Sequence, residues 1–178
     1  MIRFGGLDRY LADIKDEYFT HLETITKTGD MSNGLATKEV EARLEQITGR
    51  KVLLVTSGSI AMNIILSHLN IGKGDEVITI GYGPPAIVGP ITFLGATPKF
   101  IEINRYGSMD CTQLDSALTK NTKAVIAIGL YGDMYDHEIV DKFCRTNKLH
   151  YINDANQSAF AKYKGCLLYT SDAADELC

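Results

Sequence analysis

Apolar residues in the N-terminal part of the chain recur at the spacing of amphipathic helices. One set recurs every three or four positions and predicts a helix: Leu11, Ile14, Tyr18, Leu22 and Ile25. The polar stretch 28–34 predicts a loop by its composition. A second helix is expected to begin near Thr37 and to end at Gly49, because glycine is typical just after the last helical residue.

From Lys51 onward the apolar residues form short runs without polar alternation. The runs that predict buried strands are 51–57, 76–80, 97–103, 123–130 and 149–154. Helix-length segments lie between them, at 59–69, 110–118 and 135–147. Strands that are apolar on both faces and alternate with helices indicate a parallel sheet covered on both sides. The predicted fold class is therefore α/β, with a doubly wound and mostly parallel sheet.

Composition adds mainly exclusions to this picture. The 178 residues are 45% hydrophobic and 22% charged, with a net charge of −4, so we expect a folded core rather than disorder. Because there is no block of like charges and no long apolar run, neither nucleic acid nor a membrane is expected as a partner. The cysteines lack C-x-x-C spacing and disulfide density, which favours a reducing cytoplasm. They are Cys111, Cys144, Cys166 and Cys178.

The last segment, CLLYTSDAADELC (166–178), differs from the rest of the chain. It carries acidic residues without a basic one, and its first part resembles one reading frame of a transposase adapter used in sequencing libraries. We therefore expect residues 166–178 to be a non-native tail and exclude them from fold reasoning. A natural acidic helical tail is the alternative.

Ligands of doubly wound sheets bind at the carboxyl ends of the strands, often against the start of a helix. In VTSGSIAM an apolar run leads into Ser57, Gly58 and Ser59, and a helix follows. The free N–H groups of a helix start attract phosphate, Gly58 allows close approach, and both serine hydroxyls can donate. The alternative is a plain serine N-cap, since serine is favoured there for capping alone.

Two further strand ends carry candidate site residues. In NDANQ, Asp154 could accept a hydrogen bond from a protonated ring nitrogen, and Gln157 could donate to an oxygen of the same ring. Asp154 could equally cap the next turn. In GYGPPAIVGP (81–90), which we expect to be a rigid non-helical corner, Tyr82 could stack on a flat ligand or serve as an ordinary core or surface tyrosine.

Taken in order, these stretches resemble the DegT/DnrJ/EryC1/StrS family of sugar aminotransferases, which use pyridoxal phosphate (PLP). The motifs that carry the resemblance are TGDMSNG, VTSGSIAM, GKGDEVI, FLGATPKFIEI, LYGDMYD and NDANQSAFAKYKG. They span residues 1–165. The resemblance implies a fold type I aminotransferase in which residues 1–165 form the N-terminal part of the PLP-binding large domain.

The resemblance also implies roles for the candidate residues. The segment Ser57, Gly58 and Ser59 would hold the cofactor phosphate, Asp154 would pair with the pyridinium nitrogen, and Gln157 would bind the phenolic oxygen. A proline, Pro84, stands where the family has an aromatic residue that stacks on the ring, and Tyr82 is the candidate replacement. The Schiff-base lysine follows a serine-containing segment that does not occur here. Neither Lys162 nor Lys164 takes that role, so no catalytic residue is assigned and this chain is expected to be inactive alone.

For the full-length enzyme the resemblance implies transfer of an amino group from an amino-acid donor, glutamate, to a keto group on a nucleotide-linked sugar. Such enzymes serve surface-polysaccharide or natural-product sugar biosynthesis and are typically homodimers. One alternative is a pyridoxamine-phosphate-dependent sugar 3-dehydrase of the same family, which PPAIVGPI favours and Gln157 opposes. Another is a non-catalytic phosphate-ligand binding or regulatory module.

Overall fold

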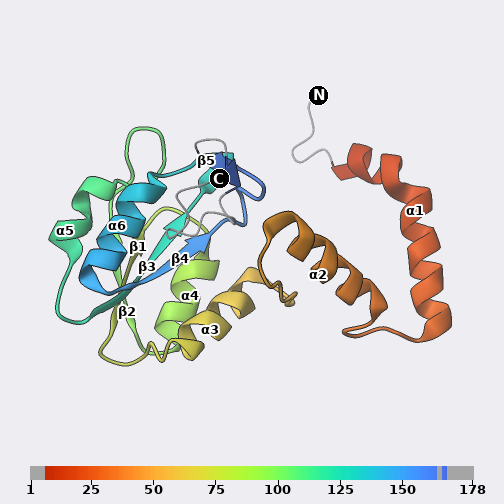
Figure 1. The fold of residues 1–178 in the computed structure, drawn as a ribbon, viewed down its shortest axis with the longest axis horizontal. Coiled ribbons are helices and arrows are strands. Elements are labelled where there is room, and N and C mark those ends of the chain that lie inside the picture. Colours follow the sequence, from red (N-terminus) through yellow and green to blue (C-terminus); the bar gives the residue numbers. More distant parts are fainter. Residues whose placement is uncertain (1–6, 164–165, 168–178) are drawn as a thin grey trace. The chain divides into compact units, whose positions relative to one another are not determined.

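The computed structural model describes residues 7–163 and 166–167, and the chain divides into two compact units (Figure 1). The first unit ends at Leu54 and the second begins at Val55. Apart from Cys166 and Leu167, the expected non-native tail lies outside the described residues. Its origin therefore stays a prediction.

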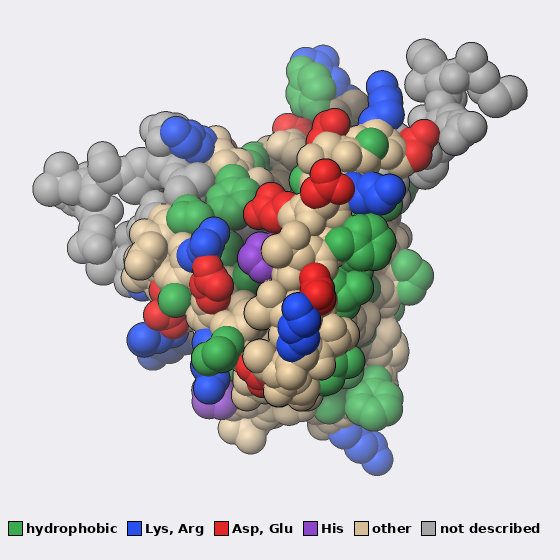
Figure 2. Space-filling view, turned by 90° about the vertical axis from the view of Figure 1, so that its right-hand side faces the viewer, with side chains coloured by type: hydrophobic (Ala, Val, Ile, Leu, Met, Phe, Trp, Pro, Cys, Tyr) green, Lys and Arg blue, Asp and Glu red, His purple; other side chains and the backbone are tan. Residues whose placement is uncertain are grey.

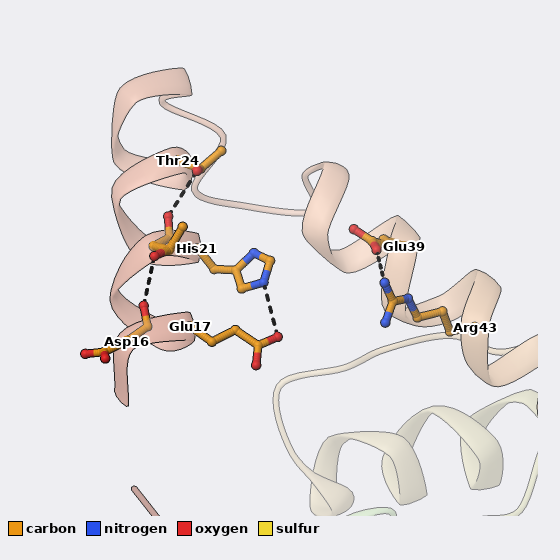
Figure 3. A network of polar contacts seen from close by, with 7 residues as sticks. Asp16, Glu17, His21, Thr24, Glu39 and Arg43 are labelled. Atoms are coloured by element: carbon orange, nitrogen blue, oxygen red, sulfur yellow. Dashed lines mark hydrogen bonds and ion pairs between the residues drawn. The ribbon is translucent and has the colours of Figure 1, made fainter. Parts of the chain in front are cut away.

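The first unit contains the two predicted helices, α1 (Leu7–Thr28) and α2 (Leu35–Thr48). Helix α2 ends at Gly49, whose left-handed backbone (φ 66°) lets its N–H donate to Glu45 O, as the sequence predicted. Exposed side chains on these helices pair one turn apart, as between Glu17 and His21 in Figure 3. Such pairs contribute little to stability because water competes for both partners. Charged side chains of both signs also stand among hydrophobic ones on the face drawn in Figure 2.

The strand expected at 51–57 is wrong. Residues 51–55 belong to no strand, and Leu53 is 73% exposed. Side chains of α2 take the backbone donors that a strand partner would need: the N–H of Val52 donates to Glu45 Oε1 at 3.2 Å, and that of Leu54 to Glu41 Oε1 at 2.8 Å. The apolar run therefore follows a helix instead of joining the sheet.

The second unit is built on a four-stranded parallel sheet with the order β2-β1-β3-β4. The strands are β1 (Glu76–Ile80), β2 (Thr97–Ile101), β3 (Thr122–Ile128) and β4 (His150–Asp154). Side chains of the two central strands, among them Ile78 and Ile126, are completely buried. The predicted parallel sheet is thus confirmed, with the strand ends shifted by a few residues.

Helices cover both faces of this sheet. They are α3 (Gly58–His68), α4 (Pro85–Phe93), the short η1 (Cys111–Gln113) and α5 (Leu114–Ala117), and α6 (His137–Asn147). The chain leaves β1 for β2 on one side and β3 for β4 on the other, so right-handed crossovers put α4 and α6 on opposite faces. Figure 1 shows α3 and α4 on one side of the strands and α5 and α6 on the other. Two short strands, β5 (Lys162–Tyr163) and β6 (Cys166–Leu167), pair antiparallel beyond β4.

The segment 81–90 is not the non-helical corner that its prolines predicted. Pro84 takes the extended conformation before α4, and Pro85 occupies its first turn, where a missing N–H costs nothing. An interior proline such as Pro90 costs about 3 kcal/mol. Burial of Ile87 and Ile91 contributes about 1.5–3 kcal/mol each and offsets that cost. Packing against the sheet therefore decides in favour of a helix.

Candidate functional site

The strand order reverses between β1 and β3, and the segments after these two strands meet. Tyr82 follows β1, Tyr131 follows β3, and their hydroxyls lie 3.2 Å apart. This hydrogen bond raises the pKa of Tyr131. In doubly wound sheets the crevice at such a reversal is the usual ligand site. A ligand site is therefore expected at the carboxyl ends of β1, β3 and β4.

Helix α3 begins with free backbone donors. Ser57 is its N-cap, and Ser57 Oγ accepts a hydrogen bond from Ile60 N at 3.3 Å. The first intrahelical bond runs from Ala61 N to Ser57 O at 3.0 Å. The N–H groups of Gly58 and Ser59 precede these bonds and point out of the helix start. Serine capping, the simpler interpretation of the motif, is thus present, and it leaves both donors available to an anion.

Strand β4 ends in a tight turn around Asp154, which is 9% exposed. The carboxylate oxygen Oδ1 accepts the N–H of Asn156 at 3.1 Å, and the Asp154 carbonyl accepts the N–H of Gly129 at 3.2 Å. The other carboxylate oxygen, Oδ2, accepts no hydrogen bond from any residue that the structure describes. A nearly buried carboxylate thus keeps one acceptor for a ligand, while also serving the turn that the alternative interpretation predicted.

Gly58 and Asp154 line the same cavity, which has a volume of about 310 Å³. Its walls come from α3 and from the end of β4 with the following turn: Gly58, Ala61, Met62, Ile65, Ile152, Asn153, Asp154, Ala155, Asn156 and Ala159. Of the six residues predicted from the sequence, Ser57, Ser59, Tyr82 and Gln157 are not part of this wall. The structure therefore brings together the two residues expected to bind opposite ends of one ligand.

Gln157 and Tyr82 belong to a second group of contacts, joined by Tyr131. The N–H of Tyr131 donates to Gln157 Oε1 at 3.0 Å, which leaves the Gln157 amide nitrogen to donate elsewhere. Tyr131 has a left-handed backbone (φ 55°), a conformation that is costly for a tyrosine and concentrates at functional sites. No role was predicted for Tyr131 from the sequence. Its place directly after a central strand is the signal that could have found it.

A chain of partly buried hydrogen bonds runs from Asn153 away from the cavity. The Tyr135 hydroxyl donates to Asn153 Oδ1, lies 2.6 Å from the Tyr151 hydroxyl, and Tyr151 in turn lies 2.6 Å from His137 Nδ1. Tyr135 has one hydroxyl proton and donates it to Asn153, so Tyr151 must donate to Tyr135. The proton of Tyr151 is then used as well, so His137 donates to Tyr151. Burial raises the pKa of both tyrosines and lowers that of His137. The direction of every bond in this chain is therefore fixed.

Residues 12–174 match the sequence profile of the DegT/DnrJ/EryC1/StrS aminotransferase family. The chain belongs to this family. The resemblance predicted from the motifs is thereby confirmed, and enzymes of the DegT/DnrJ/EryC1/StrS family use PLP and act on nucleotide sugars.

Individual relatives agree with the assignment. The chain is 34% identical over 167 residues to UDP-2-acetamido-2-deoxy-3-oxo-D-glucuronate aminotransferase of Pseudomonas aeruginosa, covering 93% of this chain and 46% of the relative. It matches the structure of S. venezuelae DesV in complex with a ketimine intermediate with a TM-score of 0.80 and 25% identity, covering 91% of this chain and 44% of DesV. The chain thus spans less than half the length of these relatives.

A third similarity bears on the fold alone. A DegT/DnrJ/EryC1/StrS aminotransferase from Brucella abortus matches with a TM-score of 0.85 and 23% identity, covering 89% of this chain and 45% of that structure. The predicted partial fold type I architecture is confirmed.

Across residues 7–163 and 166–167 no group of three or more His, Cys, Asp or Glu side chains could hold a metal ion. In the same part of the chain no helix is both long enough and apolar enough to cross a membrane.

Proposed function

We propose that this chain binds the phosphate and the ring nitrogen of PLP for a sugar aminotransferase. The phosphate accepts hydrogen bonds at the start of α3, from the segment Ser57, Gly58 and Ser59. Asp154 accepts a hydrogen bond from the protonated ring nitrogen. The observation that carries the proposal is the single cavity lined by Gly58 and Asp154.

The residues present fit the charges of such a ligand. The cofactor has an anionic end and a ring nitrogen that becomes cationic when protonated. The cavity offers a helix start to the first and a nearly buried carboxylate to the second. Gly58 has no side chain to obstruct the anionic end. Bound PLP would supply an electron sink that the amino acids lack.

Each side chain has a separate task in this proposal. The negative charge of Asp154 keeps the ring nitrogen protonated, because an adjacent opposite charge favours the cationic form. Gln157 donates its amide to the phenolic oxygen, and the bond from Tyr131 to Gln157 Oε1 holds the amide in that orientation. Tyr82, held by the hydroxyl of Tyr131, offers an aromatic surface to the ring.

For the whole enzyme we propose transfer of an amino group from glutamate to a keto group on a nucleotide-linked sugar, by a cytoplasmic homodimer. Support comes from family membership and from the Pseudomonas relative, whose name specifies an aminotransferase for a UDP-linked oxo-glucuronate. We propose that the 178-residue chain does not transaminate by itself, because neither Lys162 nor Lys164 matches the position of the catalytic lysine.

A binding measurement tests the cofactor site. Pyridoxamine 5'-phosphate is the suitable probe because, unlike PLP, it does not react with surface lysines. We expect the 178-residue chain to bind it and Asp154→Asn to weaken binding about 10- to 100-fold, the range for a hydrogen bond to a charged group. The asparagine keeps an oxygen for the Asn156 N–H, so the turn is preserved. Asp115→Asn, on the exposed surface of α5, is the matched control. Equal affinity of wild type and Asp154→Asn would refute the ring-nitrogen contact.

A further inference from the structure

Asn156 reaches across from the β4 turn to the start of α3. A Cβ atom added to Gly58 would lie 2.7 Å from Asn156 Nδ2, so the Asn156 amide occupies the space that a side chain at position 58 would take. Both residues also line the cavity that contains Asp154. No role was predicted for Asn156 from the sequence. Its position two residues after Asp154 was the only signal.

The structure of the turn does not explain this side chain. Asn156 contributes to the turn through its backbone N–H, which donates to Asp154 Oδ1, and any residue except proline could do the same. The Asn156 amide makes no hydrogen bond to another residue in the described part of the chain. Because Asn156 is exposed, its amide is free to meet a ligand entering the cavity.

The amide presents its donor end to other donors. The nitrogen of Asn156 lies closer to the Cβ position of Gly58 than the oxygen does, at 2.7 Å against 3.8 Å. The neighbouring groups at the helix start are the N–H groups of Gly58 and Ser59, which carry partial positive charge. The Asn156 nitrogen thus lies beside the helix start, and in the described part of the chain neither it nor the N–H groups of Gly58 and Ser59 donate to a protein acceptor. An anion placed there would accept from all of them.

We infer that Asn156 donates a hydrogen bond to the cofactor phosphate and is a further cofactor-binding residue. The inference rests on the proposed PLP site and adds a side chain from the β4 turn to a cradle otherwise made by α3. One short segment then holds both ends of the cofactor, the ring nitrogen through Asp154 and the phosphate through Asn156. It also gives a second reason for glycine at position 58, because any side chain there would displace the amide.

The test compares two probes that differ only in the phosphate. Pyridoxamine 5'-phosphate and pyridoxamine are titrated into the 178-residue wild type and into Asn156→Ala. We expect Asn156→Ala to weaken binding of the phosphorylated probe about tenfold and binding of pyridoxamine less than about twofold, since one hydrogen bond to a charged group is lost only with the former. Asn156→Asp puts a negative charge beside the phosphate, so its loss should be larger and should shrink with added salt.

Asn121→Ala, an exposed asparagine just before β3, is the control for the same chemical change at the other end of the sheet. If Asn156→Ala weakens the binding of both probes equally, or of neither, the phosphate contact is overturned. In that case a loss of affinity in Asp154→Asn would still support the proposed function. A wild-type chain that binds pyridoxamine 5'-phosphate no better than pyridoxamine overturns both. Thermal unfolding of each variant checks that the fold is retained.

Discussion

The two ends of the parallel sheet differ in how their polar groups are satisfied. At the amino ends of the strands lies a cavity of about 560 Å³, larger than the 310 Å³ cavity beside Asp154. Its walls include Lys120, Lys123 and Lys148. The Thr119 hydroxyl in this wall is satisfied within the protein: it donates to Glu76 Oε2 at 2.5 Å and accepts from Asn121 N at 3.1 Å.

The carboxyl ends show the opposite arrangement. The N–H groups of Gly58 and Ser59, the amide of Asn156 and one oxygen of Asp154 are all left for a partner that the described protein does not supply. Cavity size alone would favour the amino end of the sheet. Unsatisfied groups of opposite character within one cavity, at the carboxyl end of β4, favour the position beside Asp154 instead.

The largest expected effect is a loss of stability from a substitution at the carboxyl ends of the strands. A Cβ atom on Gly129 would lie 2.8 Å from the Cβ of Ser158 and 3.1 Å from Asp133 O, and neither neighbour is the end of a flexible side chain. We expect Gly129→Ala to lower the free energy of unfolding by about 2–3 kcal/mol, the cost of overpacking, as measured by urea denaturation. Gly89→Ala is the control, because a Cβ there meets no atom within 4 Å and alanine favours the helix.

A second substitution shows whether the close approach of residues 129 and 158 causes the loss of stability in Gly129→Ala. Ser158→Gly removes the opposing Cβ, so combining it with Gly129→Ala should cost less than the two single changes added together. Additive losses would mean that the close approach of these two residues does not limit stability, and the carboxyl end would be more adaptable than the distances indicate.

Gly58→Ala separates ligand binding from folding at the same end. The neighbour of the new Cβ is the movable amide of Asn156, and alanine suits the first turn of α3, so stability should change by less than about 0.5 kcal/mol. Affinity for pyridoxamine 5'-phosphate should fall about tenfold because the amide is displaced. If that is the mechanism, Gly58→Ala combined with Asn156→Ala loses no more affinity than either change alone. Multiplied losses would contradict it.

The sequence predicted the sheet well where burial is complete. The mostly apolar runs that became β1 and β3 admit few other structures. The run 51–57 was read wrongly because its outcome depends on Glu41 and Glu45, whose carboxylates take its backbone donors. Pro90 led to the opposite error, a helix that was not predicted. The cost of a proline inside a helix can be read from the local sequence, but the burial of α4 against the sheet that offsets it cannot.

The candidate site was predictable to the extent that it follows from topology. Strand ends and helix starts led to Gly58 and Asp154, and the structure places both in one cavity. Their roles toward PLP stay predictions. Tyr131 and Asn156 were missed because one depends on a left-handed backbone and the other on a side-chain rotamer, and neither is encoded by hydrophobic pattern.

At the amino end a smaller, favourable change is expected. Lys148 ends α6 with a left-handed backbone (φ 55°), which costs about 1–2 kcal/mol for a residue with a Cβ. Lys148→Gly removes that cost but gives the unfolded chain more freedom, so we expect a net gain of about 0.5–1 kcal/mol in urea denaturation. Affinity for pyridoxamine 5'-phosphate should not change. A change would show that the two ends of the sheet are coupled.

The smallest effect concerns pH and the hydrogen-bond chain that starts at Asn153. Burial lowers the pKa of His137, outweighing the opposing charges of Asp141, Glu138 and Asp136. The unfolded chain therefore binds a proton more readily than the folded one. This penalty is absent above the ordinary histidine pKa of about 6.5, and stability is lost as the pH falls through that value toward the lower folded pKa.

His137→Asn keeps a nitrogen donor near Tyr151 but cannot take up the proton. We expect the variant to resemble wild type at pH 8 and to lose less stability between pH 7 and pH 5, by a few tenths of a kcal/mol to about 1 kcal/mol, in urea denaturation at each pH. If the free energy of unfolding of both proteins depends on pH in the same way, a group other than His137 takes up the proton. A variant that is less stable than wild type already at pH 8 would give a different result. It would show that His137 stabilises the fold mainly through its hydrogen bond to Tyr151.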